Sequence, residues 1–142
     1  MSSRLAAAVG TAAALAAAAC GSAGGPPKGI PAYTDHYMMR ISTDPDHARA
    51  RERTTFKVVV RDKKTGQPLD GGEGRIFGNT NDPGVKVWDS FIQGAEPGTY
   101  YANIHYIIAG DWSMALQFRR DSTQPLERVD WTQSVYNATS EP

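Results

Sequence analysis

Bulky and polar residues alternate most strictly between Trp112 and Phe118. Trp112, Met114, Leu116 and Phe118 share one parity, and small or polar residues fill the positions between them. A period of two with bulky residues on one side is typical of a half-buried β-strand. The run 100–108 is rich in aromatic and β-branched residues and follows a Pro-Gly turn. We therefore expect a second strand there, joined to the first by a corner at 109–111.

Shorter stretches of the chain repeat this pattern. They predict strands over 33–42, 54–62 and 85–92, a short strand at 75–77 and a final strand within 126–136. Clusters of Gly, Pro, Asn and Asp separate these stretches. The pattern predicts an all-β fold, a single immunoglobulin-like antiparallel β-sandwich of about seven strands. With only 1 cysteine in the chain, its core must depend on packing without an intramolecular disulfide.

The N-terminal residues have a different character. A short start containing Arg4 is followed by an Ala-rich apolar run over 5–19, the size of a signal-peptide core, and then by Cys20. Small residues before a lone cysteine resemble the lipobox of bacterial lipoproteins, although Ala17 stands where Leu or Val is more usual. We expect residues 1–19 to be a lipoprotein signal peptide and Cys20 to carry acyl chains that bind a membrane. Plain secretion and an uncleaved anchor helix are the alternatives.

The chain is therefore predicted to consist of four parts. The signal peptide is followed by the lipidated cysteine and a flexible Gly- and Pro-rich tether over 20–32, by the sandwich over 33–136, and by a tail over 137–142. It places the protein outside the cytoplasm and anchored to a membrane, on the periplasmic side if the cell is diderm. Inner and outer membrane remain alternatives.

The charge is balanced. The 142 residues include 15 Lys and Arg and 15 Asp and Glu. Because a nucleic-acid-binding protein normally carries a basic stripe, we expect no nucleic-acid partner, and the same balance argues against electrostatic attachment to anionic lipid. The sequence has no phosphate-cradling loop and no recognisable nucleophile motif, so we expect neither an enzyme nor a small-molecule substrate.

Three groups of residues resemble a known family. They are Asp62, Gly66 and Pro68, then Gly98 and Tyr100, and then the corner Gly110, Asp111 and Trp112. The arrangement resembles the YtkA-like or FixH-like domain over residues 37–120. That resemblance implies an exported or membrane-bound immunoglobulin-like module. Several members are linked to copper handling or to assembly of cytochrome oxidases, which implies a respiratory or photosynthetic electron-transfer complex as partner.

Copper chemistry is the alternative function. His36, Met38 and Met39 are the candidate metal ligands, because imidazole and thioether groups suit Cu(I). His36 and Met38 share one strand face, and a third ligand would have to come from elsewhere, such as His47 or His105. The competing interpretation is that Met39 packs in the core and Met38 fills a gap in the packing. The segment 76–92, where copper-linked members of the family often carry Met and His, contains neither. We therefore expect no cofactor, with copper as the alternative.

Aromatic residues are the best candidates for a binding surface. One small sandwich has little room for all its rings, and amphipathic rings are favoured at interfaces. The candidates are Trp88, Tyr101, Trp131 and Tyr136. The alternative is that these rings cover the edges of the sandwich. The sequence thus predicts a non-catalytic, membrane-tethered module that docks onto a membrane-protein complex or helps to assemble it, or else a copper carrier.

Overall fold

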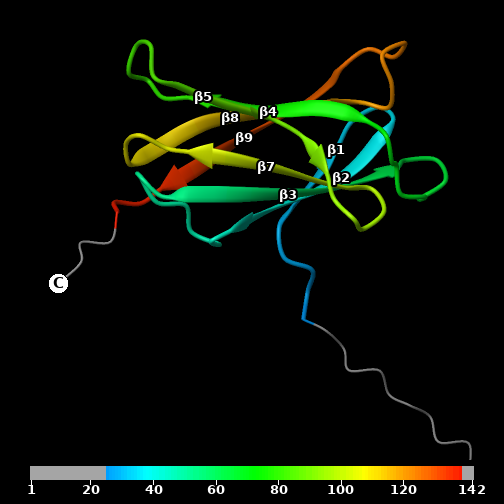
Figure 1. Ribbon diagram of the computed structural model, residues 1–142, viewed down its shortest axis with the longest axis horizontal. Coiled ribbons are helices and arrows are strands. Elements are labelled where there is room, and N and C mark those ends of the chain that lie inside the picture. Colours follow the sequence, from blue (N-terminus) through cyan, green and yellow to red (C-terminus); the bar gives the residue numbers. More distant parts are fainter. Residues whose placement is uncertain (1–24, 139–142) are drawn as a thin grey trace, which may run out of the picture.

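The computed structural model describes residues 25–138, so the predicted signal peptide and Cys20 lie outside the described residues. Two antiparallel sheets pack face to face (Figure 1). The first sheet has the order β1 (Ile30–Tyr33), β2 (Tyr37–Asp44), β3 (Arg53–Asp62), β7 (Thr99–His105) and β6 (Ile92–Gln93). The second has the order β5 (Lys86–Ser90), β4 (Glu73–Asn79), β8 (Gly110–Arg119) and β9 (Glu127–Val135). Over the described residues there is no apolar helix of membrane-spanning length.

The predicted immunoglobulin-like sandwich is confirmed. The chain crosses between the sheets from β3 to β4, from β5 to β6 and from β7 to β8. This order follows the immunoglobulin pattern, in which strand E pairs with strand B of the same sheet, as β7 pairs with β3 here. Two strands were not predicted. β1 lies partly in the expected tether, where Pro31 is tolerated because β1 is an edge strand, and β6 is too short to show a pattern.

The core lies between the two inner faces. The predicted parity of β8 is confirmed, since Trp112, Leu116 and Phe118 are fully buried, and β3 supplies the opposing Phe56, Val58 and Val60. Edge-to-face ring pairs join the layers: the ring centres of Tyr106 and Trp112 are 5.1 Å apart, and those of Tyr100 and Phe118 are 5.3 Å apart. Such ring geometry adds to the stabilisation from buried area. Packing thus replaces the disulfide of antibody domains.

One buried polar group predicts a stabilising substitution. Thr54 is fully buried, and its hydroxyl has no hydrogen-bond partner among residues 25–138. Replacing it by the similarly shaped Val removes this unsatisfied group, so we expect Thr54→Val to raise the free energy of unfolding by about 1 kcal/mol in urea titration. Thr99→Val is the matched control, because the equally buried Thr99 hydroxyl donates to the Pro97 carbonyl. A loss of stability in Thr54→Val would contradict this assignment.

Candidate functional site

The three candidate copper ligands do not converge. Met39 lies on the inner face of β2 and is 4% exposed in the core. Met38 lies on the opposite face of the same strand, in a depression with Tyr33 and Val59. His36 precedes β2, and its imidazole contacts the Glu127 carboxylate. Residues 25–138 also contain no group of three or more His, Cys, Asp or Glu side chains arranged to hold a metal ion.

The two candidates for a third ligand lie in other surroundings. The His47 ring packs edge-on against Tyr136, with ring centres 5.5 Å apart. His105 ends β7 on its exposed side, opposite Arg53 of β3. Neither contact places these imidazoles beside Met38.

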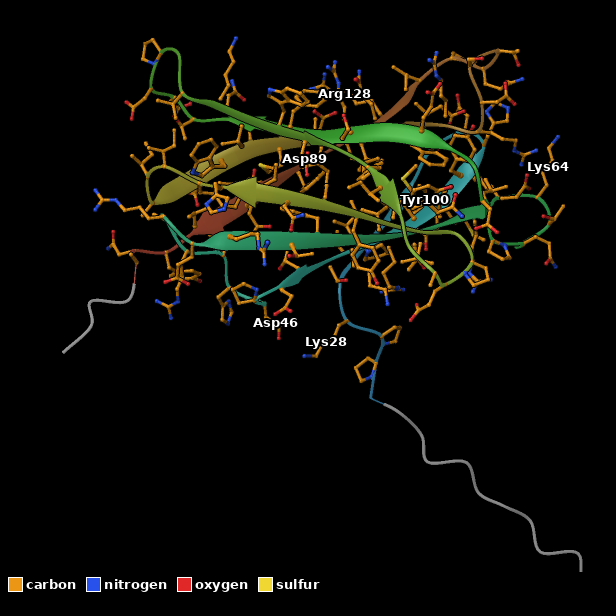
Figure 2. The ribbon with its side chains drawn as sticks, viewed as in Figure 1. Lys28, Asp46, Lys64, Asp89, Tyr100 and Arg128 are labelled. Carbon is orange, nitrogen blue, oxygen red and sulfur yellow. The ribbon has the colours of Figure 1, made fainter. Side chains whose placement is uncertain are left out.

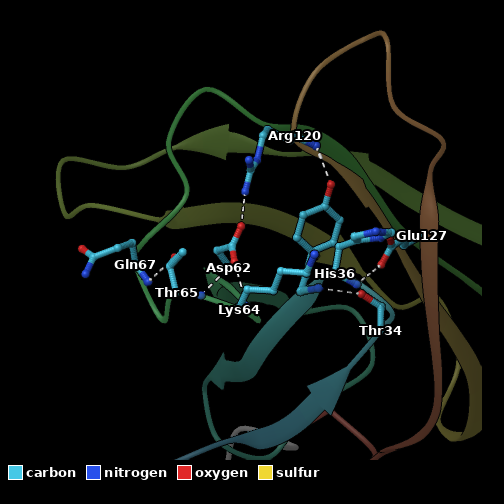
Figure 3. A network of polar contacts seen from close by, with 9 residues as sticks. Thr34, His36, Asp62, Lys64, Thr65, Gln67, Arg120 and Glu127 are labelled. Carbon is cyan, nitrogen blue, oxygen red and sulfur yellow. Dashed lines mark hydrogen bonds and ion pairs between the residues drawn. The ribbon is translucent and has the colours of Figure 1, made fainter.

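His36 belongs instead to a polar network at one end of the sandwich (Figure 3). The Glu127 carboxylate accepts a hydrogen bond from the His36 backbone N–H at 3.1 Å as well as contacting its ring. Partial burial alone would raise the pKa of Glu127, but hydrogen bonds from Thr34 and His36 outweigh it and hold the pKa below its ordinary value of 4.5. Glu127 therefore ties the start of β9 to the turn between β1 and β2.

A second ion pair extends the network. Arg120, just after β8, pairs with Asp62 at the end of β3, and the Arg120 backbone N–H donates to the Tyr37 hydroxyl at 3.0 Å. The backbone N–H groups of Thr65 and Lys64 also donate to Asp62, and they lower the pKa of its carboxyl together with Arg120. These contacts join three loops, so we assign these residues a structural role.

Acid should weaken this end of the domain. Because the pKa of Glu127 is lowered by folding, its carboxylate stabilises the fold above about pH 4.5, and this contribution is lost as the pH falls through the folded value. We expect Glu127→Gln to cost about 1 kcal/mol at pH 7, and the difference from the parent protein to shrink toward pH 3 in urea titrations. Glu96→Gln, which removes an exposed ion pair with Lys57, should have little effect at either pH. A stability difference for Glu127→Gln that does not change with pH would contradict the lowered pKa of Glu127 in the folded protein.

The four predicted aromatic residues occupy different parts of the molecule. Tyr101 is half-buried on the outer face of the five-stranded sheet, and Tyr136 follows β9 and is 52% exposed beside His47. Trp131 points inward and contacts the Phe56 ring, so it contributes to the core rather than to a free surface. Trp88 alone of the four lies on the outer face of the four-stranded sheet. They therefore do not form one patch.

Trp88 instead belongs to a patch of different composition. It is 68% exposed on β5 and lies directly opposite Phe77 of β4. The guanidinium carbons of Arg75 and Arg128 lie 5.1 and 5.2 Å from the centre of the Phe77 ring, within cation–π range. Together with Lys86 these residues line a shallow depression. We call the set Arg75, Phe77, Lys86, Trp88 and Arg128 the Phe77–Trp88 patch.

The neighbouring residue of β5 fixes the direction of Trp88. Asp89 points toward the other sheet, where its carboxylate accepts the Asn103 backbone N–H of β7 at 2.7 Å. Since successive side chains of a strand point to opposite faces, Trp88 must point outward. Asp89 also satisfies part of the exposed edge of β7, which holds β5 against the five-stranded sheet.

Arg128 reaches Phe77 diagonally across β8, over the small Ala115. Ala115 of β8 pairs with Phe77 on one side and with Asp130 of β9 on the other. It is 2% exposed, covered by its neighbours. Strand alternation could have placed Arg75 and Phe77 on one face, but no local signal joins them to Arg128, since that contact depends on the register of three strands. The sequence therefore indicated Trp88 and missed its surroundings.

Comparisons of the chain with family models, with curated proteins and with solved structures gave no match in any of the three. The resemblance to the YtkA-like or FixH-like domain therefore stays a prediction.

Proposed function

We propose that the protein is a non-catalytic immunoglobulin-like module, held on the extracytoplasmic side of a membrane by acyl chains at Cys20, that docks onto a membrane-protein complex and helps to assemble or stabilise it. The Phe77–Trp88 patch carries the proposal. It presents a tryptophan that is 68% exposed on a sheet, with two arginines over the neighbouring aromatic ring. Trp and Arg are the residue types most enriched at the energetic centres of protein interfaces.

The charges of the patch indicate the chemistry of its partner. Arg75, Lys86 and Arg128 surround the two rings, and the nearby Asp130 is already paired with Arg128 at 2.7 Å. A partner surface that offers carboxylates around an apolar pocket would complement this arrangement. The family resemblance adds that the partner belongs to the respiratory or photosynthetic electron-transfer class.

Affinity capture from detergent-solubilised membranes tests the docking. We expect the lipidated full-length protein to recover a stoichiometric membrane-protein partner, and Trp88→Ser to weaken that association about 30-fold or more, as for an interface hot spot. Tyr136→Ser is the matched control, because Tyr136 is also exposed but lies beyond the patch. Recovery of the parent protein as a free monomer, or equal recovery of the partner by Trp88→Ser, would contradict the proposal.

A further inference from the structure

The two outer faces of the sandwich differ in charge. In the four-stranded sheet, acidic and basic side chains are interspersed along the strands. The five-stranded sheet has acidic residues only at strand ends, Asp44 and Asp62. Arg40, Lys57 and Arg61 lie on its outer face, with Arg40 and Lys57 in β-strand register beside Val59 and Tyr101. The overall neutrality of the chain therefore conceals a cationic face, whose charge comes from Arg40 and Arg61 because Lys57 is paired with Glu96 at 3.1 Å.

Exposed apolar side chains flank these cations on the two edge strands of the sheet, β1 and β6. Tyr33 is 65% exposed and pairs with Met38, which in turn lies opposite Arg61. At the other edge of the sheet Ile92 is 70% exposed and pairs with Tyr101. We call the set Tyr33, Met38, Arg40, Lys57, Arg61, Tyr101 and Ile92 the cationic face. Tyrosine and basic residues interspersed with aliphatic side chains are the composition that favours the headgroup region of a bilayer.

The chain leaves the domain toward this face. The Arg40 guanidinium, which belongs to the cationic face, donates to the carbonyls of Pro27 and Gly29 at 3.2 and 3.3 Å. The Gly29 backbone is pressed against β2, since a Cβ there would lie 2.5 Å from the Ile41 carbonyl oxygen. Figure 1 shows the segment that leads into β1 leaving the domain on the side of β2 and β3, away from β4 and β5. In Figure 2, Lys28 and Asp46 lie on that side and Arg128 on the other.

The tether is short. From Cys20 to Pro27 the chain can span at most about 25 Å, and a flexible Gly-rich chain of that length averages about 15 Å. Because the tether joins the domain beside Arg40, an anchor at Cys20 keeps the Arg40 side of the cationic face within about 25 Å of the bilayer.

We infer that the cationic face rests on the anionic headgroups of the phospholipid bilayer and orients the domain, so that the Phe77–Trp88 patch points away from the membrane. This inference rests on the anchor at Cys20 proposed above. The acyl chains hold the protein at the membrane, and the cationic face selects its orientation. Each arginine brought to an anionic surface favours the bound orientation about fivefold.

A pair of labelled variants tests the orientation. Ser42→Cys places a thiol on the outer face of the five-stranded sheet beside Lys57, and Thr132→Cys places one on the opposite outer face. The lipidated full-length protein, with Cys20 blocked by its acyl chains, is labelled with a polarity-sensitive fluorophore and reconstituted into vesicles of phosphatidylglycerol and phosphatidylcholine. We expect the label at position 42 to be several-fold less accessible to aqueous iodide than the label at position 132, and the difference to fall in phosphatidylcholine alone.

Charge variants with equal net charge sharpen the test. Arg40→Gln with Arg61→Gln should raise iodide access at position 42 to nearly that at position 132, because the pair is expected to shift the orientation by up to about 25-fold. Ser113→Glu with Thr132→Glu, assayed with the label at position 42, changes the net charge equally on the opposite face and should leave the protection in place. Circular dichroism checks that each variant is folded.

Three results would overturn the inference. They are equal accessibility of both labels, protection of position 132 instead of 42, and protection of position 42 only in native membranes, which would assign the cationic face to a protein partner. The intact mass and vesicle flotation of the same preparation test the anchor separately. An unacylated protein that does not float refutes the anchor and with it this inference, whereas an acylated protein that floats with equally accessible labels refutes the orientation alone.

Discussion

Trp112→Ala is expected to lower the free energy of unfolding by about 3–5 kcal/mol, the cost of removing a large ring from a packed core. Trp112 is fully buried, its ring packs edge-on against Tyr106, and its indole N–H donates to the Ile108 carbonyl at 3.1 Å. The substitution removes the ring contacts and leaves that carbonyl without its donor. Since a domain of this size is stable by about 5–15 kcal/mol, a large part of its stability should be lost.

Chemical denaturation followed by circular dichroism measures this effect. Trp88→Ala is the matched control, because it removes the same side chain from a position that is 68% exposed and should change stability by no more than about 0.5 kcal/mol. If both substitutions cost the same, the core described here would be wrong.

Gly98→Ala is expected to cost about 2–4 kcal/mol, because the backbone conformation and the space around the residue both exclude a side chain. Gly98 has a φ of 67°, and a Cβ there would lie 2.6 Å from the Val60 carbonyl oxygen. Its carbonyl accepts the Val60 N–H at 2.7 Å, and its N–H donates to Asp70 at 2.7 Å. A shift to relieve the clash would disturb both hydrogen bonds where β7 joins β3.

Gly71→Ala separates the two causes. Gly71 has a φ of 72°, but a Cβ there would meet nothing within 4 Å, so only the conformational cost of about 1 kcal/mol should appear. Urea titrations of the two variants should therefore differ by more than about 1 kcal/mol. Equal destabilisation would show that steric exclusion at Gly98 contributes nothing.

The strands that could be predicted are those with one face in the core and the other exposed to solvent. In β8 the inner positions carry Trp112, Leu116 and Phe118 and the outer positions are small or polar, so the period of two is visible in the sequence. β5 gives no such signal, because Val87 and Trp88 are both bulky. Only the structure shows that Asp89 turns toward β7 and that Trp88 therefore points outward.

The candidate site was less predictable because its contacts join residues far apart in the chain. His36 meets Glu127 across 91 positions, so the imidazole that suggested a copper ligand has a carboxylate partner that no local pattern reveals. Arg128 reaches the Phe77 ring diagonally across β8, whose small Ala115 pairs with Phe77 and with Asp130, so the contact depends on the register of three strands. Likewise, a balanced composition conceals the separation of Arg40 and Arg61 from the acidic residues, since the total charge contains no information about faces.

Native mass spectrometry of a gentle detergent extract of the membranes tests most directly the claim that this is a lipid-anchored docking module. We expect a chain that begins at Cys20, carries acyl chains, and is found in a defined complex with a larger membrane protein that Trp88→Ser dissociates. An unacylated chain, or an acylated one that is found only as a free monomer, would contradict it.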